Sequence, residues 1–283
     1  MTERPRVALA TAAHMPELDE DGPDLRAALA AEGLDVDVQV WDDPAVDWSG
    51  YDLVVLRTVW DYWDKHEEFL AWTRSVPRLL NAPSVIEWNT DKAYLGRLAA
   101  HGVPVVPTTY LTSLDGWEPP AHRFVVKPSV SAGARDTAAY DGGDPTAVAH
   151  VAALLARGKT VMVQPYLDAV DADGETAVLV FDGVVSHAVR KGALLTPGGG
   201  IGAPDDYREH IVAREPTADE VAVAEQVLAV VRAWGDELLY ARVDLLPGPV
   251  LIELEVTEPS LFLRHSEGAA QRFAAAVRRA LAP

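Results

Sequence analysis

The 283-residue chain contains no cysteine, which excludes disulfides, thiolate nucleophiles, Fe–S clusters and cysteine-based zinc sites. Basic residues are scarce, since 24 Lys and Arg stand against 43 Asp and Glu for a net charge of −19. Nucleic acids and anionic membranes are bound through Lys and Arg, so we expect neither as a partner. No hydrophobic run approaches the ~18–20 residues that a membrane span needs. These absences predict a cytoplasmic protein whose anionic ligands are held by a few local cations or by a metal.

Strand and helix patterns alternate over the first ninety residues, which indicates an α/β unit with a parallel sheet. The apolar runs predict strands at Val7–Ala12, Val36–Trp41 and Tyr51–Arg57. Helices are expected at Pro23–Glu32, where Gly33 is a stop signal, and at His66–Ser75.

The remaining residues continue the mixed pattern, and the Asp182-Gly183 dipeptide predicts a tight hairpin turn. A capping box, Thr217-x-x-Glu220, opens a long helix that ends near Trp234. Further helices are expected at Asp91–Ala100, Pro145–Ala156 and from Ser266 onward. Further strands are expected at Phe124–Lys127, Thr137–Tyr140, Val161–Gln164, Thr176–Phe181, Val184–Val189, Leu239–Leu245 and Val250–Val256.

The most informative segment is the last predicted hairpin. Side chains alternate between faces along a strand, so Arg242 and Asp244 share one face, and Glu253 and Glu255 share one face. If the register brings these faces together, three carboxylates converge, and each pair at ~4 Å costs roughly 4 kcal/mol at an effective dielectric of 20. A hard divalent cation such as Mg²⁺ removes that cost. The hairpin therefore predicts a metal site, with a solvated acidic edge as the alternative.

Two of the few lysines stand where a phosphate can bind. Lys127 ends a strand and precedes the small-residue loop 129–134, whose N–H groups can line phosphate oxygens. Lys92 is expected in the first turn of a helix, where it opposes the helix dipole unless an anion lies nearby. An ordinary surface lysine is the alternative at each position.

Other nucleotide and catalytic motifs are missing from the sequence. There is no G-x-x-x-x-G-K-[ST], and Gly198-x-Gly200-x-x-Ala203 follows no strand, so its match to the dinucleotide fingerprint is accidental. No His-x-x-x-His pair or Ser/His/Asp arrangement stands out, and His187 is interpreted as structural. The chain is therefore neither a P-loop nor a dinucleotide-binding protein.

The segments, in this order, resemble the ATP-grasp superfamily, which includes D-alanine–D-alanine ligase and glutathione synthetase. The resemblance spans residues 89 to 256 and rests on NTDKAYLGRLAAHGVPVVPT, FVVKPS with its small loop, VMVQPYL, a GE strand, and ARVDLL…LIELE. Within the superfamily, VVLRTVWDYW, NAPSVIEWNTDKAYL and ELEVTEPSLFL are similar to the O-ureido-D-serine cyclo-ligases of cycloserine biosynthesis.

The resemblance implies an α+β fold of three parts: an N-terminal α/β domain (1–88), a small ATP-binding subdomain (89–168) and a C-terminal subdomain with the metal site (169–283). It implies ATP and two Mg²⁺ ions as cofactors, with Mn²⁺ as an alternative metal. By the same resemblance, Lys92 and Lys127 bind the ATP phosphates under the loop Ser129, Ser131 and Gly133. The other implied roles are an adenine hinge of Gln164, Tyr166 and Leu167, ribose binding by Glu175, metal binding by Asp244, Glu253 and Glu255, and catalysis by Arg242 and Arg190.

Three departures from the family pattern bear on the substrate and the metal. Glu255 stands where Asn is usual, Gln164 stands where Glu is frequent, and residues 257–261 replace the usual small-Pro-Gly ending. The acceptor pocket is therefore expected to differ from that of the dipeptide ligases. Arg57 and Tyr62 are further candidates for binding the substrate, and packing residues are the alternative for both.

The implied function is a ligase that activates a small amino-acid-like carboxylate as an acyl phosphate and joins it to nitrogen. The nitrogen belongs to the same molecule in a cyclo-ligase, or to a second one in a dipeptide or γ-glutamyl ligase. The sequence is also compatible with an inactive nucleotide-binding sensor or an acidic interaction protein, and both monomer and homodimer stay open. The Gly- and Pro-rich loop Thr196–Pro204 is expected to close over the site as a lid.

Overall fold

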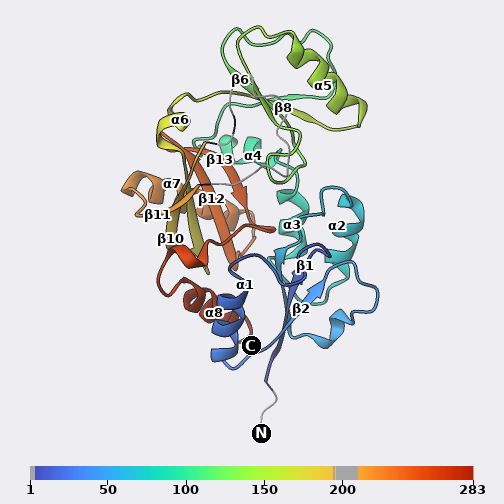
Figure 1. Ribbon diagram of the computed structural model, residues 1–283, viewed down its shortest axis with the longest axis vertical. Helices are drawn as coiled ribbons and strands as arrows, with labels where there is room; N and C mark the ends of the chain where they lie inside the picture. Colours follow the sequence, from blue (N-terminus) through green and yellow to red (C-terminus); the bar gives the residue numbers. More distant parts are fainter. Residues whose placement is uncertain (1–3, 194, 196–209, 283) are drawn as a thin grey trace.

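The computed structural model describes residues 4–193, 195 and 210–282, and its strands form three sheets (Figure 1). The N-terminal sheet has the order β2-β1-β3-β4 with parallel pairing throughout, so the predicted parallel α/β unit is confirmed. Its elements are β1 (Arg6–Thr11), α1 (Gly22–Ala31), β2 (Asp35–Val40), the 3-10 turn η1 (Trp48–Gly50), β3 (Leu53–Thr58), α2 (His66–Ser75), β4 (Leu79–Leu80) and α3 (Pro83–Asn89).

The N-terminal sheet is covered on both faces, which explains why β1 is apolar along its length. Val7 and Leu9 face the core that contains α1, whereas Ala8 and Ala10 face the core that contains Phe69 of α2. The first of these cores also includes α8 (Ala269–Ala280), which lies beside α1 (Figure 1). The C-terminal helix thus completes the N-terminal core.

The middle sheet is antiparallel, has the order β5-β8-β6-β7 and lies at the upper end of the molecule in Figure 1. Helix α5 packs on it through Ala147, Val151 and Leu154. The elements of this part are α4 (Tyr94–Ala100), β5 (Thr109–Leu111), β6 (Phe124–Pro128), β7 (Ala138–Tyr140), α5 (Thr146–Ala156), β8 (Val161–Pro165) and α6 (Ala169–Asp173).

The C-terminal sheet is antiparallel, with the order β11-β10-β9-β12-β13. One face is apolar and packs on α7, and the capping box predicted at Thr217 and Glu220 is present at the start of that helix. The β9–β10 turn has Asp182 and Gly183 at φ of 51° and 75°, as the hairpin prediction requires. The elements are β9 (Glu175–Phe181), β10 (Val184–Lys191), β11 (Ile211–Arg214), α7 (Ala218–Ala233), β12 (Tyr240–Leu246), β13 (Val250–Glu255), η3 (Leu263–His265) and α8.

Two expectations about local structure need correction or fall outside the described chain. Lys92 lies between α3 and α4, before the first helical residue Tyr94, and so is not in the first turn of a helix. The proposed lid, Thr196–Pro204, lies outside the described residues. Among the helices that the structure describes, none is long and apolar enough to cross a membrane.

Candidate active site

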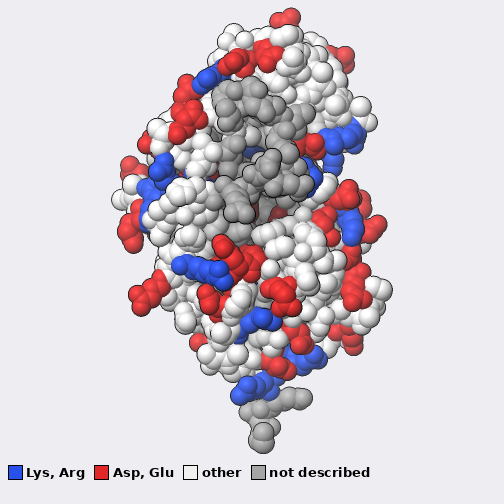
Figure 2. Space-filling model, viewed as in Figure 1, with Lys and Arg blue, Asp and Glu red and all other residues white. Residues whose placement is uncertain are grey.

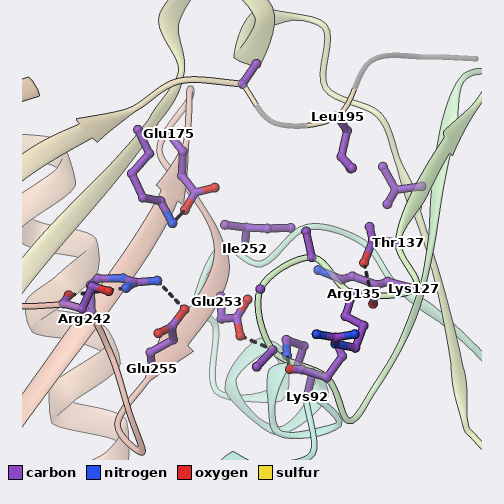
Figure 3. A pocket seen from close by; sticks show the side chains of 18 of the residues that line it. Lys92, Lys127, Arg135, Thr137, Glu175, Leu195, Arg242, Ile252, Glu253 and Glu255 are labelled. Carbon is purple, nitrogen blue, oxygen red and sulfur yellow. Dashed lines mark hydrogen bonds and ion pairs between the residues drawn. The ribbon is translucent and has the colours of Figure 1, made fainter. Parts of the chain in front are cut away.

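A cavity of about 670 Å³ lies where the middle sheet, the C-terminal sheet and loops of the N-terminal part meet (Figure 3). This volume is in the range of sites for nucleotides and drug-sized ligands. Most of the residues singled out in the sequence line it: Lys92, Lys127, Ser131, Gly133, Gln164, Tyr166, Leu167, Glu175, Arg242, Glu253 and Glu255. Residues distant in sequence are therefore brought to one place, as the resemblance implied.

The charged hairpin β12–β13 has the register that a common polar face requires. Arg242 is opposite Glu255, and Asp244 is opposite Glu253. The guanidinium of Arg242 donates to Asp244, with Nε 2.9 Å from Oδ1, and also pairs with Glu255 (Figure 3). Three carboxylates and one guanidinium thus share one face of the sheet.

Lys191 is a member of this cluster that the sequence motifs did not reveal. Its ammonium nitrogen lies 2.7 Å from Oδ2 of Asp244 and also pairs with Glu175. Arg190, the neighbouring residue that was expected in the site, turns away from the cavity and donates to the backbone carbonyls of Ala172 and Asp173. The structure therefore places Lys191, and not Arg190, in the site.

A β-bulge explains why Lys191 takes this place. The β9–β10 turn pairs Val184 with Phe181, but the register shifts by one residue between Val185 and His187. Beyond the shift, Lys191 and not Arg190 is opposite Glu175. A shift of one residue moves every later side chain to the other face of the strand, so the bulge directs Lys191 into the cavity.

Two further lysines face the carboxylates from the other side of the cavity. Lys92 Nζ lies 3.0 Å from Oε1 of Glu253 and donates to the carbonyl of Ser131 at 2.7 Å. Lys127 is also buried, and within the described part of the chain no carboxylate oxygen lies within 4.0 Å of its Nζ. Three of the five lysines in the sequence thus line one cavity of a strongly acidic protein, whose acidic surface is evident in Figure 2.

The four cluster carboxylates differ in how burial and cations balance. Burial raises the pKa of Glu255 to about 8 and that of Glu175 to about 7, because it outweighs the pull of Arg242 and Lys191. At Asp244 burial is outweighed by Arg242 and Lys191, and its pKa is held well below the ordinary value. Lys92 and Lys127 likewise lower the pKa of Glu253 against the effect of burial. Burial therefore dominates at Glu175 and Glu255, whereas the cations dominate at Asp244 and Glu253.

The donor set of this cluster suits Mg²⁺, a hard cation that takes oxygen ligands. Among the described residues, no three acidic or histidine side chains are grouped closely enough to hold an ion by themselves. Each cluster carboxylate is instead paired with Lys or Arg. Mg²⁺ is often bound through one or two carboxylates plus substrate phosphates, and the two cavity-lining carboxylates Glu253 and Glu255 are compatible with that mode.

Apolar side chains also line the cavity. Ile252 of β13, labelled in Figure 3, lines it from the C-terminal sheet, and Tyr166 and Leu167 line it from the segment after β8. The side-chain amide of Gln164 donates to Thr108 Oγ1 at 2.8 Å, so the side chain is already engaged within the middle sheet. Such a slot fits a flat ring that is recognised by backbone groups.

Besides Arg190, four predicted residues lie beside the cavity without lining it, and one of them is Asp244, which is hydrogen-bonded to Arg242 and Lys191. Ser129 is buried, and its carbonyl accepts a hydrogen bond from the backbone N–H of Lys92. Arg57 is buried and donates to the carbonyl of Pro259 at 2.9 Å. Tyr62 is buried near Glu258, a cavity-lining carboxylate that no sequence motif singled out.

The clustering of lysines and carboxylates between two antiparallel sheets is the arrangement of an ATP-grasp ligase. Solved ligases of this class share the fold: D-alanine–D-alanine ligase from Bacillus anthracis has a TM-score of 0.63 at 16% identity, over 97% of this chain and 94% of that one. PsnB, solved with a precursor, Mg and ADP, has a TM-score of 0.60 at 18% identity, over 99% of each chain.

The chain belongs to the D-cycloserine synthetase (DcsG) family. It is 40% identical over 300 residues to the cycloserine biosynthesis protein DcsG of Streptomyces lavendulae, covering 98% of this chain and 99% of that protein. The crystal structure of D-cycloserine synthetase DcsG has a TM-score of 0.88 at 38% identity, over 98% of this chain and 100% of that one. The family model for the DcsG N-terminal domain matches residues 7–81. The protein is an ATP-dependent carbon–nitrogen ligase, and the resemblance inferred from its motifs is confirmed.

Proposed function

We propose that the enzyme uses ATP to phosphorylate the carboxylate of a small D-amino acid and then closes a ring within the same molecule. The observation that carries this proposal is the meeting of Lys92, Lys127, Glu253 and Glu255 at one cavity. Phosphoryl transfer needs positioning and charge neutralisation more than covalent chemistry from the protein. The family supports the substrate class, because the relatives are named for D-cycloserine.

The charged end of the cavity is assigned to the phosphates. Lys127 and Lys92 bind phosphate oxygens of ATP, and the loop with Ser131 and Gly133 covers them. Arg242 faces the γ-phosphate and holds the acyl phosphate that forms. Electrostatic stabilisation of the transferring group by such fixed cations is strongest where water is excluded.

The remaining roles are assigned to residues that line the cavity and to Asp244, which is paired with Arg242 and Lys191 beside it. The backbone of residues 164–167 binds adenine, and Glu175 faces the ribose. Asp244, Glu253 and Glu255 hold two Mg²⁺ ions, with Mn²⁺ as a substitute. When bound, the ions neutralise phosphate charge and orient the γ-phosphate.

Ring closure would form a bond from the activated carboxyl carbon to the nitrogen on the side-chain oxygen of a D-serine derivative, with release of phosphate. In O-ureido-D-serine this nitrogen also carries a carbamoyl group, which water would have to remove as carbon dioxide and ammonia to give D-cycloserine. O-ureido-D-serine is the substrate of this class to test first. Purified protein with ATP, Mg²⁺ and this compound alone is expected to release ADP and to form D-cycloserine, detected by chromatography. Turnover that requires two amino acids together, such as a pair of D-alanine molecules, would instead establish intermolecular ligation.

A further inference from the structure

Among the described residues, five glutamates line the cavity, and one of them differs from the others in its partners. Glu175, Glu253 and Glu255 each pair with Lys or Arg, and Glu20 at the rim lies 3.7 Å from Arg264. Within the described part of the chain, no Lys or Arg nitrogen lies within 4.0 Å of the Glu258 carboxylate. Glu258 is nevertheless only 8% exposed. A buried carboxylate without a cation is costly, so a cationic group on a ligand would compensate it.

The backbone around Glu258 is held firmly, as a binding residue requires. Trp60 donates from Nε1 to the carbonyl of Glu258 at 3.0 Å. Arg57 donates to the next carbonyl, at Pro259, and the hydroxyl of Thr257 donates to Asn89 at 2.9 Å. The segment that departs from the dipeptide-ligase pattern is therefore fixed from both sides.

A neutral side chain lies near Glu258. Tyr62 is buried close to this carboxylate, and its hydroxyl can favour one orientation of the carboxylate. Burial raises the pKa of Glu258 to about 7, although Lys92 and Tyr62 oppose the rise. A bound cation would add the stabilisation that the charged form lacks.

The position of Glu258 fits the geometry of an amino acid. It follows Glu255 by three residues, directly after the end of β13, and lines the same cavity as Arg242. In an α-amino acid only one carbon separates the ammonium group from the carboxyl group. A group that binds the ammonium must therefore adjoin the place where the carboxylate reacts.

We propose that Glu258 binds the α-ammonium group of the amino-acid substrate and that Tyr62 positions the Glu258 carboxylate. The assignment rests on the proposed function, in which the substrate carboxylate reacts beside Arg242 and Glu255. It makes Glu258 a specificity-determining residue, since a carboxylic acid without the ammonium group would leave this carboxylate uncompensated.

The test compares O-ureido-D-serine with its analogue that has hydrogen in place of the α-ammonium group. For the wild-type enzyme, we expect kcat/KM for the amino acid to exceed that for the analogue by roughly 30-fold or more, the usual scale for a lost buried charge pair. Glu258→Gln should remove most of this preference and leave the affinity for ATP within about twofold. Tyr62→Phe should weaken the preference less. Glu20→Gln is the matched control and should keep the preference unchanged.

The outcomes separate the two proposals. If Glu258→Gln keeps the wild-type preference, or loses activity equally with both compounds while binding ATP normally, the assignment of Glu258 is wrong and the proposed function stands. If the wild type does not use O-ureido-D-serine but another D-amino acid stimulates ADP release, the proposal that the enzyme cyclises O-ureido-D-serine is wrong. The role of Glu258 is then decided by the same comparison, made with that D-amino acid and its analogue without the ammonium group. Thermal melting identifies a variant that fails to fold, and Glu258→Asp replaces Glu258→Gln in that case.

Discussion

Lys191 lies between Glu175 of β9 and Asp244 of β12, and its ammonium nitrogen is 2.7 Å from Asp244 Oδ2. One lysine thus ties together a proposed ribose-binding carboxylate and a proposed metal ligand from two neighbouring strands. All three side chains are largely buried, and only 6% of the lysine side chain and 2% of the aspartate side chain are exposed. Burying the ion pair of Lys191 and Asp244 costs desolvation energy, so removal of either partner is expected to destabilise the fold.

Replacing this lysine is expected to lower both stability and activity. Lys191→Met leaves the carboxylates of Glu175 and Asp244 buried without this cation, which should reduce the free energy of unfolding by about 3 kcal/mol. Urea denaturation measures the loss, and ADP release should fall with it. Arg190→Gln is the control, because this side chain contacts backbone carbonyls outside the cavity. Equal effects of the two substitutions would contradict the assignment of Lys191 to the site.

The metal assignment predicts a loss of chemistry without a loss of fold. Glu253→Gln keeps the shape of the side chain but removes the charge that faces Lys92 and, as proposed, Mg²⁺. We expect ADP formation to fall by about 100-fold or more, while the melting temperature changes little because this side chain is 27% exposed at the cavity. Chelation of Mg²⁺ in the wild type should have the same effect on ADP formation and be reversed by added Mg²⁺. Near-normal turnover of Glu253→Gln would refute the assignment.

The phosphate assignment predicts a dependence on pH. Burial, reinforced by the nearby Lys92, lowers the pKa of Lys127 to about 8 although Glu253 opposes the shift. The ammonium form is therefore present below about pH 8 and is lost above it, so ATP affinity should fall as the pH rises through this value. Lys127→Ala and Lys92→Ala should each weaken ATP binding. Calorimetry measures the ATP affinity across the range from about pH 7 to about pH 9.5.

The control for this dependence is Lys127→Arg, which keeps a charge at every pH in the range because arginine does not deprotonate. Its ATP affinity is expected to vary less between the two ends of the range than that of the wild type. An identical pH profile in both proteins would show that another group controls binding. Unchanged ATP affinity in both alanine variants would place the nucleotide elsewhere.

Much of the fold could be predicted because local patterns and tertiary structure agree. The alternation in β12 and β13 correctly put Arg242 with Asp244, and Glu253 with Glu255, on common faces, whereas the register of Arg242 to Glu255 depends on a bulge between Asp244 and Leu245. The parallel N-terminal sheet and the capping box of α7 were likewise evident from residue patterns. Each of these features depends on neighbours that are close in the sequence.

What could not be predicted depends on irregularities and on distant contacts. The bulge near Ser186 reverses which of two adjacent basic residues faces the cavity, and uniform alternation from the Asp182-Gly183 turn gives the wrong one. The break between α3 and α4 places Lys92 outside a helix. Glu258 carried no signal in the sequence because its place at the cavity arises only when residues 57–62 pack against its segment.

A contact between Arg135 and Trp63 gives the last prediction. The Arg135 guanidinium carbon lies 4.0 Å from the centre of the Trp63 ring, and both residues line the cavity. Arg135 belongs to the segment between β6 and β7 that is assigned to the phosphates, whereas Trp63 belongs to the N-terminal part. We expect this contact to hold the segment over bound ATP, so Trp63→Leu and Arg135→Ala should each raise the KM for ATP several-fold. The double variant should be little worse than either single one, with a coupling energy of about 0.5–1 kcal/mol.

Arg97 and Trp234 provide the control pair. The Arg97 guanidinium carbon lies 3.9 Å from the centre of the Trp234 ring, and neither residue lines the cavity, so the loss of this contact should leave the KM for ATP unchanged. Additive effects of the Trp63 and Arg135 substitutions would show that the two residues act independently.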